Sequence, residues 1–314
     1  MNIVFTFRPS RDMQSDIQAT FPNETFSFYK GIEDVLSIEE AEILVTFGTD
    51  LTEEIIRQCH SLKWIMVASA GIEEMPLQAI KERDILVTNA RGIHKIPMAE
   101  FTLGYMLNHV KRFAELRTLE QSETWNKQLP LGELCGKEVA ILGTGAIGQE
   151  IARLSKAFRM STIGVNKSGH HAEEFDQIFT IDELEAAVRE ADFVVSVLPS
   201  TKETVDLLQP EHFEAMKQTA AFINIGRGDL VSETVLLSAI NDEEIAHAYL
   251  DVFAIEPLPE AHPFWRHPNI TVTPHISSVT KQYVPRAMDI FVHNLRCFID
   301  GGDYANVIDV EKGY

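Results

Sequence analysis

The sequence predicts an α/β protein with two domains, each built around a parallel β-sheet. Short apolar runs alternate with helical segments along most of the chain, which is typical of parallel strands joined by covering helices. The chain of 314 residues is too long for one simple core. Near its middle, Gly143, Gly145 and Gly148 form a G-x-G-x-x-G pattern directly after an apolar run.

The first third of the chain contains the expected strands of one sheet. They cover residues 3–7, 43–47, 64–68 and 85–88, with helices over 52–58 and 74–82. Asp50 or Thr52 is expected to cap the first of these helices. Residues 69–72 follow a strand, where the second helix is expected to open. The backbone N–H groups there, at Ala70 and Gly71, either hold a small anion such as a carboxylate or belong to an ordinary turn.

A long helix is expected over residues 98–119, with Pro97 at its start, where proline is favoured. The composition changes at this point, so we place the crossover between domains near Ala99. Residues 121–132 lose the helical periodicity. Trp125 in this stretch is expected to pack, either within the chain or at a subunit contact.

The glycine pattern lies between a strand expected over 139–142 and a helix over 146–158. In this context Gly143 permits a tight turn, Gly145 lets a pyrophosphate approach the backbone, and Gly148 lets the helix pack close to the strand. Free N–H groups at the start of the helix then face the phosphates. The residues expected to hold a dinucleotide here are Gly143, Gly145, Ala146, Ile147 and Gly148.

The choice of cofactor is expected at the end of the next strand, over 161–165. An acidic residue at this position would hold the adenosine ribose hydroxyls, but here Asn166, Lys167 and Ser168 follow the strand. An acidic side chain would repel a 2′-phosphate, whereas this group can receive one, and Asn can also bond a free ribose. The sequence favours NADP and leaves NAD open. After a strand over 193–198, the loop at Pro199 is expected beneath the nicotinamide.

Three further strands, expected over 220–225, 245–251 and 270–272, are followed by polar side chains. Arg227, Glu256 and His275 come just after these strand ends, where ligands bind in open parallel sheets. Arginine binds a carboxylate or polarises a carbonyl, histidine transfers a proton at neutral pH, and a neighbouring carboxylate orients the histidine. With a hydride donor, this set predicts reduction of a carbonyl next to a carboxylate, or the reverse reaction.

Charge and composition narrow the class of protein. The balance of 27 Lys and Arg against 47 Asp and Glu gives a net charge of −20, which disfavours nucleic acid and anionic membrane surfaces as partners. The three cysteines are isolated and no metal-binding motif is present, so we expect a reducing cytoplasm and no metal. The chain begins with a strand-like run and not with a signal peptide.

The sequence resembles the D-isomer-specific 2-hydroxyacid dehydrogenase family along nearly its whole length. The motifs that carry the resemblance, in order, are Ser69-Ala70-Gly71, Asn89-Ala90-Arg91-Gly92, Gly143–Gly148, Asn224-Ile225-Gly226-Arg227-Gly228, Leu250-Asp251-Val252-Phe253, Glu256-Pro257-Leu258-Pro259 and Thr273-Pro274-His275. Residues 256–265 and the tail 307–314 look most like the short glyoxylate/hydroxypyruvate reductases.

The resemblance implies a Rossmann-like cofactor domain, residues 100–280, inserted into a flavodoxin-like substrate domain made of residues 1–99 and 281–314. It implies that Arg227 binds the 2-oxo acid, that His275 is the general acid/base, and that Glu256 is its partner. Asp251 would contact the nicotinamide carboxamide, and the backbone at Ala70 and Gly71 the substrate carboxylate. The residues implied to line the cofactor beyond the glycine turn are Asn166, Lys167, Ser168, Pro199, Ile225, Arg227, Asp251 and His275. The helix from residue 98 would help to form a homodimer, and a final helix over 278–300 would return to the substrate domain.

Two alternatives remain at the level of sequence. A formate dehydrogenase has the same architecture but pairs its histidine with glutamine, and Glu256 argues against it. A nucleotide-sensing corepressor resembling the C-terminal binding proteins would keep Arg227, Glu256 and His275. Such a binding protein would show negligible oxidation of NADPH with any 2-oxo acid, which separates it from a reductase.

Overall fold

The computed structural model describes residues 1–72 and 74–310, so the last part of the tail motif at 307–314 lies outside the described residues. The chain forms two compact units. Unit 1 contains residues 1–93 and the segment from Thr280 onward, and unit 2 contains His94–Val279. The chain therefore leaves unit 1 at Ile93, ahead of the crossover expected near Ala99, and returns to it at Thr280.

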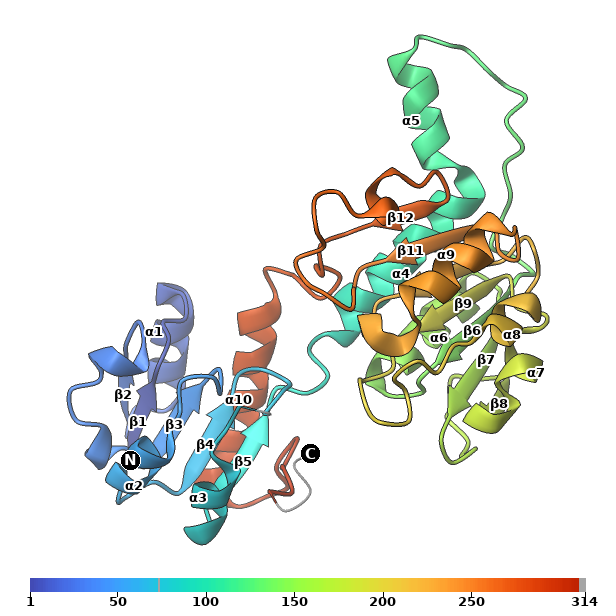
Figure 1. Ribbon diagram of the computed structural model, residues 1–314. Helices are drawn as coiled ribbons and strands as arrows, with labels where there is room; N and C mark the ends of the chain where they lie inside the picture. Colours follow the sequence, from blue (N-terminus) through green and yellow to red (C-terminus); the bar gives the residue numbers. More distant parts are fainter. Residues whose placement is uncertain (73, 311–314) are drawn as a thin grey trace. The chain divides into compact units, whose positions relative to one another are not determined.

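Unit 1 is a parallel sheet with the strand order β2-β1-β3-β4-β5, the flavodoxin-like order (Figure 1). Its strands are β1 (Asn2–Phe5), β2 (Thr25–Phe28), β3 (Ile43–Thr46), β4 (Trp64–Val67) and β5 (Leu86–Asn89). Its helices are α1 (Arg11–Thr20), α2 (Glu53–Gln58), α3 (Leu77–Glu82) and α10 (Tyr283–Asp300), with short 3₁₀ helices at Ile32–Asp34 and Ile38–Glu40.

Aromatic packing attaches α10 to this sheet. The Trp64 ring on β4 stacks against Phe291 of α10, with ring centroids 5.6 Å apart, and both side chains are fully buried. The indole N–H of Trp64 donates a hydrogen bond to Thr88 Oγ1 at 2.9 Å, so the polar end of the ring is also satisfied. Burial of such a side chain contributes about 2–3 kcal/mol, which explains how the returning C-terminal segment becomes part of unit 1.

Unit 2 is a seven-stranded parallel sheet with the order β12-β11-β10-β9-β6-β7-β8. This is the Rossmann order, extended by one strand, with its switch point between β6 and β9. Its strands are β6 (Glu138–Leu142), β7 (Ser161–Asn166), β8 (Gln177–Thr180), β9 (Phe193–Ser196), β10 (Ala221–Asn224), β11 (His247–Leu250) and β12 (Ile270–Val272). Its helices are α4 (Lys95–Lys111), α5 (Phe113–Gln121), α6 (Ala146–Ala157), α7 (Leu184–Val188), α8 (Pro210–Glu214) and α9 (Glu233–Asn241), with 3₁₀ turns at Ile181–Glu183, Gly228–Leu230 and Pro263–Arg266.

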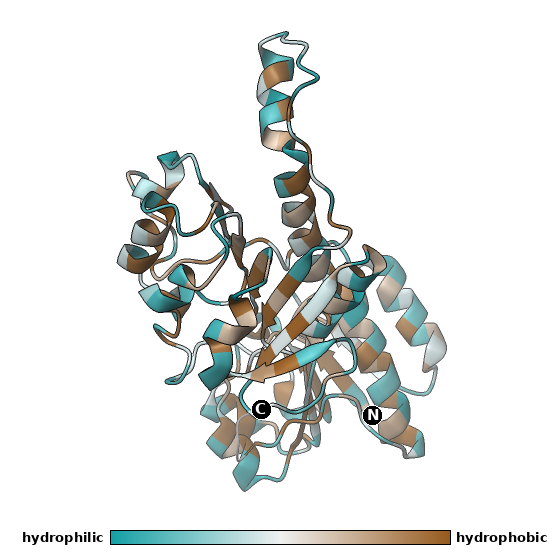
Figure 2. Cartoon of the chain, turned by 90° about the vertical axis from the view of Figure 1, so that its right-hand side faces the viewer, coloured by the Kyte–Doolittle hydropathy of each residue, from teal (hydrophilic) through white to brown (hydrophobic). Residues whose placement is uncertain are grey.

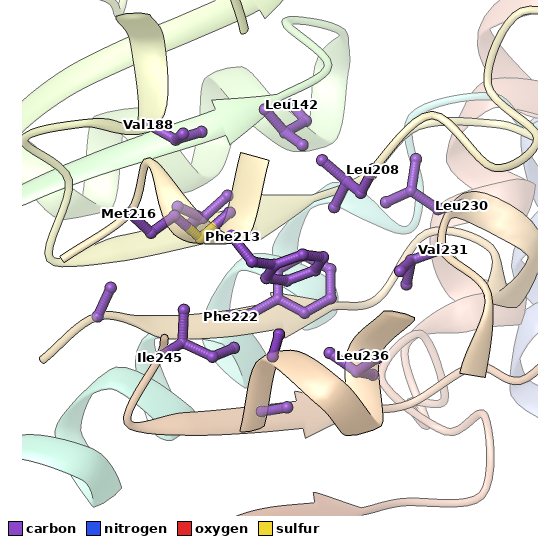
Figure 3. Close-up of a cluster of buried hydrophobic side chains, with 14 of the residues drawn as sticks. Leu142, Val188, Leu208, Phe213, Met216, Phe222, Leu230, Val231, Leu236 and Ile245 are labelled. Carbon is purple, nitrogen blue, oxygen red and sulfur yellow. The ribbon is translucent and has the colours of Figure 1, made fainter. Parts of the chain in front are cut away.

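The strands of unit 2 alternate their side chains between two cores. On β6, Ala140 and Leu142 face the core covered by α7, α8 and α9, whereas Val139 and Ile141 face the core covered by α4 and α6. Figure 3 shows the first of these cores, in which the rings of Phe213 and Phe222 meet edge to face at 5.8 Å. The strands are correspondingly brown in Figure 2, and the outer helix faces are teal. Burial on both faces explains why these strands appear as continuous apolar runs in the sequence.

The prediction of a single helix over 98–119 is wrong. The helix breaks at Arg112, which has the left-handed φ of +51°, and α5 starts a new direction at Phe113. The apolar side chains of α4, such as Met106, pack in the core of the sheet, whereas Phe113 remains 52% exposed. Because no packing holds α5 against the sheet, α5 and the loop after it form an arm that stands away from unit 2 (Figures 1 and 2).

Several element boundaries also differ from the predictions. The helix expected from residue 74 begins only at Leu77, because Pro76 disfavours helical backbone before it. Residues 69–72 therefore do not open that helix, and the prediction that they do is wrong. Helix α10 begins at Tyr283 instead of residue 278. The cap at Thr52 is confirmed, since its side chain accepts a hydrogen bond from the N–H of Ile55.

Candidate functional site

The glycine turn after β6 has the geometry that the sequence predicts for a tight strand-to-helix turn. Gly143 has a φ of +109°, which other residues rarely adopt. A Cβ added to Gly148 would lie 1.9 Å from the carbonyl oxygen of Gly143, so α6 packs directly on the turn. Only glycine fits at either position, and the first turn of α6 is thereby fixed against the end of β6.

The middle glycine leaves open space at the start of α6. A Cβ added to Gly145 would meet no atom within 4 Å, and no side chain caps the helix at this residue. The first N–H groups of a helix have no partner inside the helix and carry partial positive charge. The turn at 143–148 therefore fits a phosphate group.

The Asn166 side chain organises its own turn. Its Nδ2 group donates hydrogen bonds of 3.0 Å to Thr144 Oγ1 and to the carbonyl oxygen of His170, and its Oδ1 accepts one from Ser168 N–H at 3.1 Å. Both amide protons are thus already used. Lys167 is exposed and forms an ion pair with Glu203 over 2.7 Å. The Ser168 hydroxyl also donates to Asn166 Oδ1, over 3.4 Å. Of the three residues expected at the ribose, Lys167 is therefore the one whose ammonium group keeps further donors for a phosphate.

Arg227 is held between two glycines that pack backbone against backbone. A Cβ on Gly226 would lie 2.7 Å from the carbonyl oxygen of Leu198, and one on Gly228 only 2.0 Å from the carbonyl carbon of Phe253. The Asn224 side chain also donates to the carbonyl oxygen of Arg227 at 2.9 Å. The Arg227 backbone is thereby fixed while its residue remains exposed, so the guanidinium group is accessible to a ligand.

Glu256 and His275 form a pair across the ends of β11 and β12. The distance between His275 Nδ1 and Glu256 Oε2 is 2.8 Å, and the second oxygen of Glu256 accepts a hydrogen bond from the Phe253 N–H at 3.0 Å. A carboxylate only accepts, so Nδ1 of His275 carries the hydrogen and Nε2 remains available to a substrate. His275 also has a φ of +51°, a conformation uncommon outside glycine.

Asp251 lies beneath this pair and is fully buried. Its carboxylate accepts hydrogen bonds from Thr273 Oγ1 at 2.5 Å, Ile276 N–H at 3.0 Å and Ser277 N–H at 2.9 Å. Three donors from one segment thus converge on Asp251. Oδ1 accepts two of these bonds and Oδ2 accepts one.

The two other residues expected along the cofactor lie at neighbouring strand ends. Pro199 is exposed after β9, and its carbonyl oxygen accepts a hydrogen bond from Thr204 Oγ1 at 2.6 Å. Ile225 is only 2% exposed, and its N–H donates to the carbonyl oxygen of Ser196 at 3.2 Å. Pro199 therefore presents surface to a ligand, whereas Ile225 supports the turn before Arg227.

A cavity of about 400 Å³ borders the histidine–glutamate pair. Its lining joins the two polar side chains to an apolar wall, and consists of Phe253, Glu256, Pro257, Leu258, Trp265, Pro274 and His275. A pocket with few polar groups and an apolar wall is typical of a site that orients a small molecule.

Ala70 and Gly71 lie in unit 1, on the loop after β4. Asn89 Nδ2 donates to the carbonyl oxygen of Ala70 at 2.6 Å, and Ser69 Oγ lies 3.0 Å from the carbonyl oxygens of both Phe47 and Gly71, which share its single proton. The loop is thus held through its carbonyl oxygens. Helix α3 begins only at Leu77, so its N-terminus does not adjoin the N–H groups of Ala70 and Gly71.

Sequence reasoning assigned no role to two residues that hold this site together. Phe253 fixes Glu256 through its backbone N–H, which every residue but proline possesses, so the sequence holds no signal for it. Thr273 was recognised only as part of a motif, although its hydroxyl group lies between Asp251 and Tyr105 of α4. The hydroxyl group of Tyr105, on an otherwise apolar helix face, is the signal in the sequence that could indicate this contact.

Among residues 1–72 and 74–310, no cluster of three or more His, Cys, Asp or Glu side chains could hold a metal ion. Within the same part of the chain, no helix combines the length and the apolar character needed to cross a membrane.

Comparison with known proteins shows the family to which the chain belongs. The family described as "D-isomer specific 2-hydroxyacid dehydrogenase, NAD binding domain" matches residues 103–277. A relative from Serratia proteamaculans, "Glyoxylate/hydroxypyruvate reductase A", is 34% identical over 69% of this chain and 68% of its own length. The chain belongs to the D-isomer specific 2-hydroxyacid dehydrogenase family, whose members are oxidoreductases acting on small 2-oxo or 2-hydroxy acids.

Solved structures show the same fold. A D-isomer specific 2-hydroxyacid dehydrogenase family protein from Aeromonas salmonicida is 32% identical, with a TM-score of 0.83 over 98% of this chain and 99% of that one. A family member from Xanthobacter autotrophicus, solved with NADPH and MES, is 25% identical, with a TM-score of 0.79 over 100% of this chain and 99% of its own. The resemblance seen in the sequence is thus confirmed, and the alternative of a nucleotide-sensing corepressor finds no support among these relatives.

Proposed function

We propose that this protein reduces a small 2-oxo acid, such as glyoxylate or hydroxypyruvate, to the D-2-hydroxy acid, with His275 as the proton donor. The observation that carries the proposal is the bond of 2.8 Å between His275 Nδ1 and Glu256 Oε2 at adjacent strand ends. Membership of the 2-hydroxyacid dehydrogenase family and the exposed Arg227 at the neighbouring strand end support the same reaction.

Arg227 binds the substrate and polarises its carbonyl group. Its guanidinium group is a permanent cation with a planar set of donors, which suits a 2-oxo acid carboxylate and the adjacent carbonyl oxygen. Gly226 and Gly228 fix the backbone on both sides of Arg227. The backbone that carries the cation is therefore already in place before the substrate binds.

His275 transfers the proton from Nε2 to the carbonyl oxygen, and Glu256 keeps the ring in the required tautomer. Glu256 is itself oriented by the Phe253 N–H, so its free oxygen faces Nδ1. Glu256 accepts the hydrogen on Nδ1 throughout, so the proton that leaves is the one on Nε2. When bound, a reduced nicotinamide cofactor supplies the hydride that adds to the carbonyl carbon. In the reverse direction Nε2 accepts the proton from the hydroxyl group.

The residues that hold the cofactor follow from the two turns of unit 2. The turn of Gly143, Gly145, Ala146, Ile147 and Gly148 binds the pyrophosphate through its N–H groups, and Pro199, Ile225 and Asp251 lie toward the nicotinamide. At the ribose, Lys167 and Ser168 receive the 2′-phosphate of NADP while Asn166 shapes the turn. NADP is therefore the proposed cofactor, and a measured preference for NAD would correct this choice.

Two further features are proposed as ligand contacts, each within its own unit. In unit 1, the N–H groups of Ala70 and Gly71 bind a carboxylate. In unit 2, the cavity beside His275 has an apolar wall that includes Trp265 and Phe253, which suits the side chain of a 2-oxo acid. We propose further that the protein is a homodimer in the cytoplasm. The arm is the observation that favours the dimer, because it leaves Trp125 87% exposed and Phe113 52% exposed.

The experiment is a panel of 2-oxo acids assayed with NADPH and with NADH, for the wild-type protein and for His275→Ala. We expect turnover of glyoxylate or hydroxypyruvate, a higher kcat/KM with NADPH, and a loss of about 10²- to 10⁴-fold in kcat for His275→Ala. The affinity of that variant for NADPH should stay within about threefold, because His275 is not part of the phosphate turn.

His212→Ala is the matched control, since this half-buried histidine also uses Nδ1 in a hydrogen bond but lies on α8. It should keep wild-type turnover. Full activity of His275→Ala would disprove the proton transfer, a clear preference for NADH would disprove the choice of NADP, and no turnover of any 2-oxo acid by the wild type would disprove the reductase.

A further inference from the structure

A directed chain of hydrogen bonds connects helix α4 to the segment that carries His275. The hydroxyl groups of Tyr105 and Thr273 are 2.7 Å apart, and Thr273 Oγ1 donates to Asp251 Oδ1 at 2.5 Å. A threonine hydroxyl has a single proton, and here that proton points to the carboxylate. Tyr105 must therefore donate to Thr273, which gives the order Tyr105 to Thr273 to Asp251.

The Tyr105 hydroxyl is suited to a fixed donor role. Burial raises the pKa of Tyr105 to about 12, so the hydroxyl keeps its proton throughout the neutral range. The ring is held on two sides, by Tyr249 with ring centroids 4.7 Å apart and by Phe101 at 4.9 Å. The donor therefore has one position relative to Thr273.

Asp251 connects this chain of hydrogen bonds to the backbone around His275. Besides the Thr273 hydroxyl, its carboxylate binds the N–H groups of Ile276 and Ser277, and its backbone carbonyl oxygen accepts the His275 N–H at 2.8 Å. One buried residue thus holds the chain before, at and after His275. The left-handed backbone of His275 is unfavourable by itself and persists only where its surroundings hold it.

We propose that Tyr105 and Thr273 are positioning residues that keep His275 in place for proton transfer, acting through Asp251. Without the Thr273 hydroxyl, Asp251 Oδ1 loses its shortest partner and the carboxylate can turn, which frees the segment 275–277. Such a change affects the orientation of the imidazole ring toward the substrate more than it affects binding of the cofactor. This inference rests on the proposed reductase function only in its kinetic part.

The test compares Thr273→Val, Thr273→Ser and Tyr105→Phe in the full-length protein. Thr273→Val keeps the shape of the side chain without the hydroxyl, and a misplaced proton donor can lower kcat by about 10- to 100-fold. We expect that loss with a change of less than about twofold in the Kd for NADPH and in the KM for glyoxylate. Thr273→Ser restores the hydroxyl and should stay within about threefold of the wild type in kcat, and Tyr105→Phe should lose about three- to tenfold.

Hydrogen exchange at the Ile276 and Ser277 amides provides a readout that needs no turnover. Both amides should exchange faster in Thr273→Val and in Tyr105→Phe than in the wild type, and at the wild-type rate in Thr273→Ser. Wild-type exchange in both variants, or a kcat of Thr273→Val within twofold of the wild type, would overturn the proposal. Equal losses in Thr273→Val and Thr273→Ser would overturn it as well. If the wild type reduces no 2-oxo acid, the reductase fails while the exchange data still decide the positioning.

Discussion

Substitution of Gly145 by alanine should separate cofactor binding from folding. Gly145 has a φ of −74°, which any residue adopts, and the added Cβ would meet no atom within 4 Å. We therefore expect the free energy of unfolding to change by less than about 0.5 kcal/mol, which corresponds to about 2 °C in Tm. The same methyl group would occupy the space through which a pyrophosphate approaches the backbone of the turn.

The expected effect on cofactor binding follows from the hydrogen bonds at this turn. A hydrogen bond from a backbone N–H to a charged phosphate contributes about 1.5–3 kcal/mol, and the loss of one such bond raises the Kd by about 10- to 100-fold. Titration calorimetry with NADPH, beside a thermal melt of the same sample, measures both quantities. An unchanged Kd for NADPH in Gly145→Ala would refute the pyrophosphate site at this turn.

Two other glycines provide matched comparisons. In Gly148→Ala the methyl group would lie 1.9 Å from the Gly143 carbonyl oxygen. Relief of that contact requires a shift of about 1.5 Å in α6, so both stability and NADPH affinity should fall. Gly104 lies within α4 and a Cβ there would meet nothing within 4 Å. Gly104→Ala should therefore stabilise the helix by about 0.5–1 kcal/mol and leave NADPH binding unchanged.

Three further predictions test the cofactor choice, the pH dependence of stability and the dimer. Glu203→Gln removes the ion-pair partner of Lys167 and should raise the ratio of kcat/KM with NADPH to that with NADH by about three- to tenfold. Burial, with His109 and His267 nearby, lowers the pKa of His247 to about 4, so the unfolded chain binds the proton first as the pH falls from 6.5 to 4. Between pH 7.5 and 5 the wild type should therefore lose about 2 kcal/mol more of its free energy of unfolding than His247→Gln loses, measured by urea unfolding. Trp125→Ala should weaken the dimer by about 30-fold or more, measured by light scattering across a dilution series.

Most of the strands that could be predicted from sequence are buried on both faces, and the edge strand β12, in which only Ile270 is buried, is an exception. Strands β3 and β4 are apolar runs because every side chain in them is buried, and β6 is nearly so. The two strands that no pattern indicated, β2 and β8, are edge strands of their sheets with partly exposed side chains. An edge strand needs no apolar run, so hydrophobic periodicity is weak there.

The candidate site also contains residues that could be predicted from sequence and interactions that could not. Arg227, Glu256 and His275 could be predicted as candidates because each follows an apolar run typical of a strand, and chain order alone places those strand ends at one edge of the sheet. The use of both Asn166 amide protons within its own turn could not be predicted, since it depends on where Thr144 and His170 come to lie. The break at Arg112 could not be predicted either. No residue typical of a helix end, such as glycine, marks the position, and the break reflects the absence of packing for α5.

Backbone packing between loops explains why the reactive side chains depend on one another. The loop after β9 touches Gly226 through Leu198, and the loop after β11 touches Gly228 through Phe253. Phe253 also fixes Glu256 with its N–H, and Glu256 holds His275. Arg227 is therefore connected to His275 through the contact of Gly228 with Phe253 and two hydrogen bonds of Glu256, one to the Phe253 N–H and one to the His275 ring. Because the contact between Gly228 and Phe253 is backbone against backbone, a shift at Gly228 moves the cation and the proton donor together.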